Sequence, residues 1–79
     1  FLVFPNPSSG IFTINVIASE AKQSQVEIYN ALGEQVFTSA ISRQSSVIDL
    51  SNQSPGIYFL KVSDGKNTFS QKLIITKSN

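Results

Sequence analysis

The chain has 79 residues and a formal net charge of +1, and it contains neither cysteine nor histidine. A chain of this length forms one small domain, which buries about 60% of the surface of its unfolded state and here lacks any disulfide or zinc site for reinforcement. Its 6 basic and 5 acidic residues are scattered along the sequence, which argues against nucleic-acid binding, because that function needs clustered lysine and arginine.

The first strands are predicted on either side of a proline-containing corner. Residues 2–4 are apolar and precede Pro5, which cannot donate to a ladder, so they predict a short edge strand. Pro5, Pro7 and Gly10 then predict the corner, since proline fixes φ and glycine can take a positive φ. Residues 10–17 alternate between apolar and polar side chains, which predicts a half-buried strand.

The middle of the chain predicts a hairpin. Apolar and polar side chains alternate over residues 26–29, residues 30–33 interrupt the alternation, and an extended pattern resumes at residue 35. Gly33 is predicted to take the left-handed conformation that closes the turn, where any other residue has a steric cost.

The C-terminal third predicts three further strands. The first alternates over residues 48–50, and a polar loop then leads to the second at residues 57–62, in which the even-numbered side chains share the face opposite Lys61. A turn at residues 64–65 joins it to a last strand over residues 67–76. About seven short strands at this spacing predict an all-β fold, an immunoglobulin-like antiparallel β-sandwich with Greek-key connections.

The sequence lacks the side chains on which most enzymes depend. Without histidine or cysteine it has no usual general base, thiol nucleophile or soft metal ligand. None of its serines lies in a G-x-S-x-G turn, and its acids are dispersed, without the spacing of a calcium loop. No apolar run approaches the roughly 20 residues of a transmembrane helix. We therefore expect a non-catalytic domain without cofactor or metal and without direct membrane insertion.

The aromatic residues leave one alternative function open. Six phenylalanines and two tyrosines supply enough rings for a platform on which sugars stack. Aromatic side chains at alternating strand positions more often fill a sandwich core, unless they form an exposed row. An accessory binding or spacer module of immunoglobulin or fibronectin type, such as one that recognises carbohydrate for an attached enzyme, is the alternative.

Several motifs then occur in order along almost the whole chain. They read FPNPSSGIF over residues 4–12, VEIYNALGEQV over 26–36, IDLS over 48–51, PGIY over 55–58, and KLII from Lys72 towards Lys77. Together they resemble the type A sorting domain of the type IX (Por) secretion system, found at the C-termini of secreted Bacteroidota proteins. Gln53 and Ser54 depart from the family pattern, in which leucine is commoner before the proline. The signal residues that this resemblance implies are Pro5, Asn6, Pro7, Gly10, Gly33, Pro55, Gly56 and Tyr58.

The resemblance implies a role in export. Residues 1–79 would be the C-terminal sorting domain of a larger secreted protein, and the absence of methionine also suggests an excised piece. Such a domain reaches the periplasm with its N-terminal cargo domain and is recognised by the outer-membrane translocon and its shuttle protein. A cell-surface sortase commonly removes it by cleavage ahead of the opening motif, here before Phe1. The cargo, secreted or held on the cell surface, is then often linked to anionic lipopolysaccharide.

The C-terminal hairpin is the predicted docking element. We expect Lys72, Leu73, Ile75 and Lys77 to dock on the translocon partner by β-augmentation, because an apolar strand flanked by lysines closes the sequence. The prolines and glycines of the motifs have backbone roles and are expected to act mainly by preserving the fold. For Asn6 two roles stay open, contact with a partner or a cap on the neighbouring turn.

Overall fold

The structure is a computed structural model that describes residues 2–15, 24–41, 45–63, 65 and 67–76. These residues contain seven strands. They are β1 (Leu2–Phe4), β2 (Ile11–Asn15), β3 (Ser24–Tyr29), β4 (Gln35–Ile41), β5 (Ser45–Asp49), β6 (Gly56–Ser63) and β7 (Thr68–Ile75). The predicted all-β fold of about seven short strands is confirmed. Within these ranges no helix is long and apolar enough to cross a membrane.

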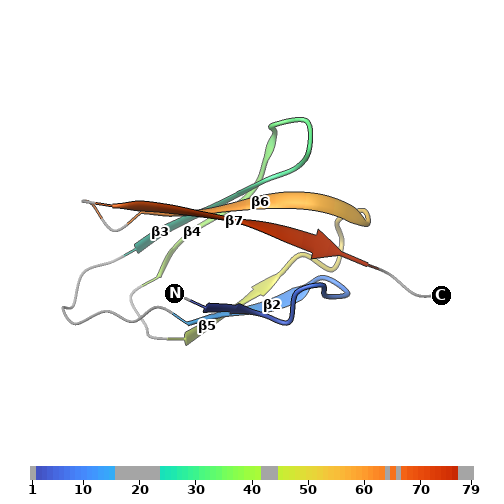
Figure 1. Cartoon of the computed structure of the whole chain (residues 1–79), viewed down its shortest axis with the longest axis horizontal. Helices are drawn as coiled ribbons and strands as arrows, with labels where there is room; N and C mark the ends of the chain where they lie inside the picture. Colours follow the sequence, from blue (N-terminus) through green and yellow to red (C-terminus); the bar gives the residue numbers. More distant parts are fainter. Residues whose placement is uncertain (1, 16–23, 42–44, 64, 66, 77–79) are drawn as a thin grey trace.

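The strands form two sheets that face one another (Figure 1). One sheet has the order β1-β2-β5 and the other the order β4-β3-β6-β7, and all neighbouring strands within the sheets are antiparallel. The chain changes sheet between β2 and β3, between β4 and β5, and between β5 and β6. The antiparallel sandwich is thus confirmed and its crossings fit an immunoglobulin-like arrangement, while the Greek-key connectivity stays a prediction.

The core lies between the sheets and is filled by alternate residues of each strand. Phe12 and Ile14 of β2, Leu60 of β6 and Leu73 of β7 are fully buried. Their strand neighbours point outward because successive side chains of a strand alternate between faces. Burial of these apolar surfaces contributes about 25 cal/mol per Å² and is the main stabilising term in a domain without disulfides.

The predicted faces of two strands can be compared directly with the structure. In β6, Tyr58, Leu60 and Val62 are buried and Lys61 is exposed, as predicted. In β2 the alternation is confirmed as far as Asn15, and residues 16–17 of the predicted strand lie outside the described residues.

Both predicted hairpins are present. Between β3 and β4, Gly33 has φ of +87° and donates its N–H to the carbonyl oxygen of Asn30 at 3.0 Å, which confirms its predicted left-handed role. The Oδ1 atom of Asn30 also accepts from the N–H groups of Leu32 and Glu34, each at 2.9 Å. Strands β6 and β7 pair from Gly56↔Ile75 to Ser63↔Thr68, and Asp64 of their predicted turn lies outside the described residues.

The burial pattern predicts how two phenylalanine substitutions affect stability. Phe12→Ala removes a fully buried ring and should lower the free energy of unfolding by about 3–5 kcal/mol. Phe59→Ala, at a side chain 47% exposed on the outer face of β6, should lower it by about 1 kcal/mol. Urea unfolding followed by tyrosine fluorescence measures both values. Equal losses would contradict the assignment of Phe12 to the core.

Candidate functional site

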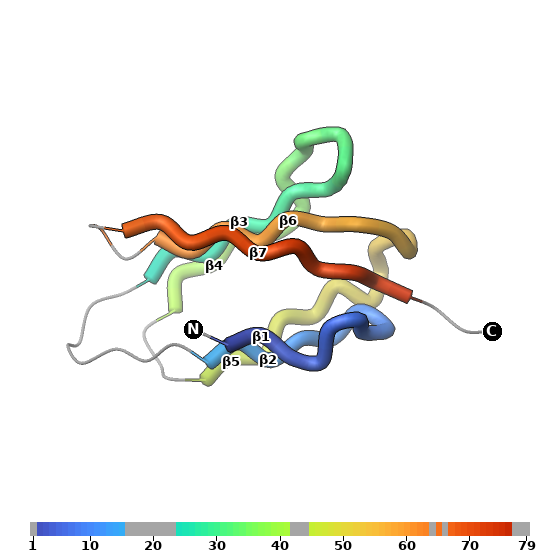
Figure 2. The backbone as a smooth tube through the Cα atoms, in the orientation of Figure 1, coloured from blue at the N-terminus to red at the C-terminus, as the bar shows by residue number. Residues whose placement is uncertain are grey.

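Motifs that are far apart in the sequence meet at one end of the sandwich (Figure 2). Ser8 forms a bridge with Ile75, and Gly56 pairs with the same residue from the other side. The N–H of Leu50 donates to the carbonyl oxygen of Gly10 at 2.7 Å. We call residues 5–10, 49–51, 55–58 and 72–76 the motif end. It contains every predicted signal residue except Gly33, which lies in the β3–β4 turn.

The opening motif covers the outer edge of β7 at the motif end. Ser8 donates its N–H to the carbonyl oxygen of Ile74 at 3.0 Å, and its own carbonyl oxygen accepts from the N–H of Thr76 at 2.7 Å. These two bonds form a parallel bridge, whereas β1, just before the prolines, pairs with β2 in the other sheet. The chain therefore crosses between the sheets over residues 5–7.

The side chain of Asn6 extends this cover along β7. Its Nδ2 donates to the carbonyl oxygen of Lys72 at 2.9 Å, and its Oδ1 accepts from the N–H of Ile74 at 3.0 Å. The amide thus takes the place that a peptide group of a neighbouring strand would occupy. The sequence left open a partner contact or a turn cap, and the structure adds a third role, pairing with a strand 66 to 68 residues away.

Ser8 is a residue of this site that sequence reasoning missed. It is only 6% exposed, and its hydroxyl donates to the carbonyl oxygen of Ile11 at 2.6 Å and accepts from the N–H of Gly10 at 3.1 Å. The second contact is a local turn of the kind that serine forms two residues ahead of an N–H. That turn chemistry, in a serine following Pro7, was the available signal.

Gly10 shows why the opening motif requires glycine at this position. Its φ is +131°, which side-chain-bearing residues rarely adopt, and a Cβ there would lie 2.8 Å from the Cα of Ser51. Leu50 and Ser51, which belong to the IDLS motif, thus approach the opening motif backbone to backbone. The glycine permits the contact that joins two motifs.

Asp49 stabilises the turn after β5, which contacts Gly10 through Leu50 and Ser51. Its Oδ1 accepts from the N–H of Ser51 at 2.9 Å, and the N–H of Gln53 donates to the carbonyl oxygen of Leu50 at 2.9 Å. Hydrogen bonds from the side chain and then the backbone of Ser51 lower the pKa of the Asp49 carboxyl, because they favour its charged form.

The PGIY motif connects its loop to the core through Tyr58. This side chain is 5% exposed, and its hydroxyl donates to the carbonyl oxygen of Ser54 at 2.7 Å. A buried tyrosine needs such a partner for its hydroxyl. Pro55 and Gly56 are exposed, so the loop presents these two residues to solvent while Tyr58 anchors it.

The predicted docking residues are divided between core and surface. Leu73 and Ile75 are 0% and 1% exposed, so their side chains belong to the core. Lys72 is exposed on β7, and Lys77 lies outside the described residues. The outer edge of β7 is already occupied at Lys72, Ile74 and Thr76 by the opening motif. Docking of a partner on this hairpin stays a prediction, and the exposed Lys72 is its described candidate contact.

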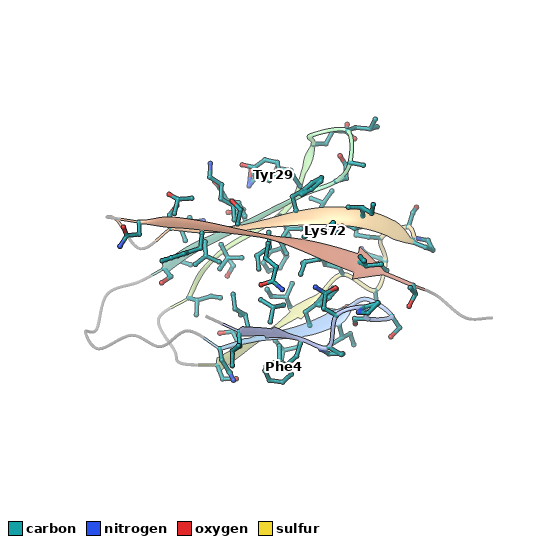
Figure 3. The ribbon with its side chains drawn as sticks, in the orientation of Figure 1. Phe4, Tyr29 and Lys72 are labelled. Carbon is teal, nitrogen blue, oxygen red and sulfur yellow. The ribbon has the colours of Figure 1, made fainter. Side chains whose placement is uncertain are left out.

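Aromatic side chains lie both in the core and on the outer faces. Phe12 and Tyr58 are buried, whereas Tyr29 and Phe59 are cross-strand neighbours on the four-stranded sheet. Figure 3 shows Tyr29 on the side of this sheet that faces away from the other sheet. The Tyr29 hydroxyl donates to Oε1 of Glu27 at 3.1 Å, and this bond raises the pKa of Tyr29. Phe4 and Phe69 are also exposed, at 45% and 47%, and the sugar-binding alternative stays a prediction.

Comparison with known proteins identifies a family for almost the whole chain. A family model described as "Secretion system C-terminal sorting domain" matches residues 2–76. No curated protein matches the chain. The matched range contains the entire motif end and Gly33.

Among the residues that the structure describes, no three His, Cys, Asp or Glu side chains gather as a metal site would require.

The Asn6 contacts generate a stability prediction. Asn6→Ala removes two hydrogen bonds to β7 and should lower the free energy of unfolding by about 1–3 kcal/mol, at about 0.5–1.5 kcal/mol for each bond. The amide of Ile74 should also exchange with deuterium faster, as NMR would show. Asn52→Ala, in the exposed loop after β5, is the control. Unchanged exchange at Ile74 would show that the Asn6 bonds are not formed in solution.

The lowered pKa of Asp49 generates a pH prediction. A carboxyl whose pKa falls on folding contributes stability above its unfolded pKa, ordinarily 3.8, and loses that contribution as pH falls through the lower folded pKa. Asp49→Asn should therefore be less stable than the unmodified domain at pH 7, and the difference should shrink as the pH falls below 3.8 and through the lower folded pKa. Urea midpoints measured between pH 2 and pH 7 test this, and parallel pH curves would contradict it.

Proposed function

The chain belongs to the family of secretion system C-terminal sorting domains, and from this we propose that it directs an attached cargo protein across the outer membrane. It is a sorting signal for type IX secretion. We place residues 1–79 at the C-terminus of a larger protein whose N-terminal part is the cargo. The domain's contribution is binding, without catalysis, and the machinery that recognises it carries out the transport.

The motif end supports recognition of the signal as a folded surface. Hydrogen bonds from the opening motif reach β7 across 66 to 68 residues of sequence, so the motifs form one surface only after the sandwich has folded. Pro5, Asn6, Pro7 and Lys72 are exposed there. Rigid groups lose little conformational entropy when they bind, which favours a preformed surface as an address. This convergence is the observation that carries the proposal.

The partners of this surface are the outer-membrane translocon and its shuttle protein, which the domain meets from the periplasm. Lys72 supplies a positive charge beside the opening motif, and Lys77 is proposed to add a second. Because the edge of β7 is already bonded at Lys72, Ile74 and Thr76, we propose contact through the exposed side chains of the motif end rather than strand addition at this edge.

Release of the cargo is proposed to occur ahead of the opening motif. A processing enzyme needs an extended, accessible bond, whereas residues 2–4 pair with β2 as strand β1. We therefore place the sortase cleavage before Phe1, in the connection to the cargo. The cargo would then be secreted or be linked to lipopolysaccharide on the cell surface, and this chemistry belongs to the sortase.

A reporter fusion tests the proposal. Residues 1–79 with their native upstream linker are placed behind a signal peptide and a fluorescent protein, in a bacterium that has the pathway and in a translocon-deficient strain. We expect reporter at the surface or in the medium only when the translocon is present. Reporter retained in the periplasm of both strains would refute the proposal and favour an accessory module of immunoglobulin or fibronectin type.

A charge reversal in the same fusion tests the motif end. Lys72→Glu should reduce export at least fivefold, because it reverses the charge beside the opening motif without touching the core. Ser70→Glu is the control, because it adds a negative charge at an exposed position of the same strand, where the cross-strand neighbour is Lys61. Both variants should melt within a few degrees of the unmodified domain. Equal export of the two variants would remove Lys72 from the recognised surface.

A further inference from the structure

The edges of the two sheets are protected unequally. Strands β1, β5, β4 and β7 occupy the edges. The opening motif covers β7 at Lys72, Ile74 and Thr76, and β1 has only 3 residues before Pro5. Covered edges, short edge strands and proline are devices by which proteins prevent unwanted strand addition.

Among the described residues, β4 and β5 have neither a cover nor a proline, although a register shift in the β3–β4 pairing between Ile28 and Tyr29 places a bulge at the start of β4. β4 reads QVFTSAI and carries no charge and no proline, and β5 reads SSVID, in which Asp49 is the charged residue. β4 pairs with β3, and β5 pairs with β2, so each leaves its other edge toward the opening between the sheets. Unpaired N–H and C=O groups along an edge strand are a template for another extended chain.

A cleft lies between these two bare edges. Its volume is about 490 Å³, and it is lined from β4 by Phe37, Ser39 and Ile41 and from β5 by Ser46, Val47 and Ile48. Ile41 and Ile48 are buried at 6% and 1% exposure and contribute little surface, so the serines and backbone groups make the exposed lining of the cleft more polar than apolar. The cleft therefore joins two strand edges to the core of the sandwich.

Two serines, Ser39 of β4 and Ser46 of β5, lie on the inner faces of the sheets at this cleft. Ser39 is paired with Val26 and Ser46 with Ile14, and both partners are fully buried. Directly paired residues share one face of a sheet, so both serines lie on the inner faces, where their neighbours are large and apolar. Serine is too small to fill the space between the sheets, and both residues remain half-buried.

We propose that this cleft binds one extended, uncharged segment of a partner protein, which adds as a strand to β4. A row of backbone donors and acceptors is satisfied by another extended backbone, and alternate side chains of that strand would enter the cleft above Ile41 and Ile48. β4 is the template rather than β5 because it has 7 residues against 5. From Phe37 to Ile41, at about 3.3 Å per residue, a segment of about five residues fits.

This inference rests on the proposed function in one respect, because the partner is a component that the domain meets during export. The two claims fail in different ways in the reporter fusion. If the unmodified domain is not exported, the proposed function is wrong. If the unmodified domain is exported and variants of the cleft are exported equally well, the proposed function stands and the cleft is not a binding site.

Filling the cleft is the first test. Ser39→Leu places an apolar side chain between the sheets, so it should keep or raise the melting temperature while export of the reporter falls at least tenfold. Ser70→Leu, the same change at an exposed position of β7, is the matched control and should leave export within twofold. A folded Ser39→Leu variant with normal export overturns the proposal.

A second test does not depend on the stability of Ser39→Leu. The photo-crosslinker benzoylphenylalanine replaces Val47, which is 68% exposed on the rim of the cleft, or Phe59 as the control on the outer face. Irradiation of cells should crosslink Val47 to a partner protein only when the translocon is present. The adduct should be lost in a variant that also carries Ala40→Lys, which adds a charge to β4. An adduct of two copies of the domain, an adduct at Phe59 alone, or persistence in Ala40→Lys overturns the proposal.

Discussion

The pairing of the opening motif with β7 is the constraint on which the rest of this structure depends. β1 belongs to the three-stranded sheet, whereas Ser8 pairs with Ile75 in the four-stranded sheet only a few residues later. The chain therefore ties the two sheets together at the motif end, in a domain that has no cysteine for a covalent tie. Without this contact the sheets would be held at that end by core packing and by the β5–β6 connection.

The same contact explains what the sorting motifs do physically. Gly10 allows the backbone of the opening motif to approach Ser51, and the Asn6 amide bonds to Lys72 and Ile74. The motif residues of the motif end are thus far apart in the sequence but in contact in the structure. Most of them set a backbone conformation or take part in a backbone hydrogen bond. The exposed residues of this region include Asn6 and Lys72, which we propose as contacts for a recognising partner. Because the edge of β7 is covered, the proposed strand addition falls on the other edge of the four-stranded sheet, at β4.

Local patterns in the sequence predicted the elements and failed at contacts between distant segments. Alternation and turn chemistry were sufficient for β6 and for the turn at Gly33, because both depend on neighbours in the chain. The partner of Asn6 lies 66 to 68 residues away, where no local pattern carries information. Ser39 and Ser46 were missed for another reason: serine is usual on outward faces, so its identity does not indicate that it faces inward.

The position of the contact between the opening motif and β7 has a consequence for the order of events during export. Asn6 and Ser8 stand near the start of the domain, and the groups they bond, at residues 72–76, belong to its last strand. Contacts of such large sequence separation form late in folding, because the loop-closure entropy must be overcome before they add stability. A domain without β7 would leave the donors and acceptors of Asn6 and Ser8 unpaired, and its motif end would not form. If the motif end is the recognised surface, as we propose, the signal exists only on a completely synthesised and folded domain, and its recognition depends on the whole sandwich.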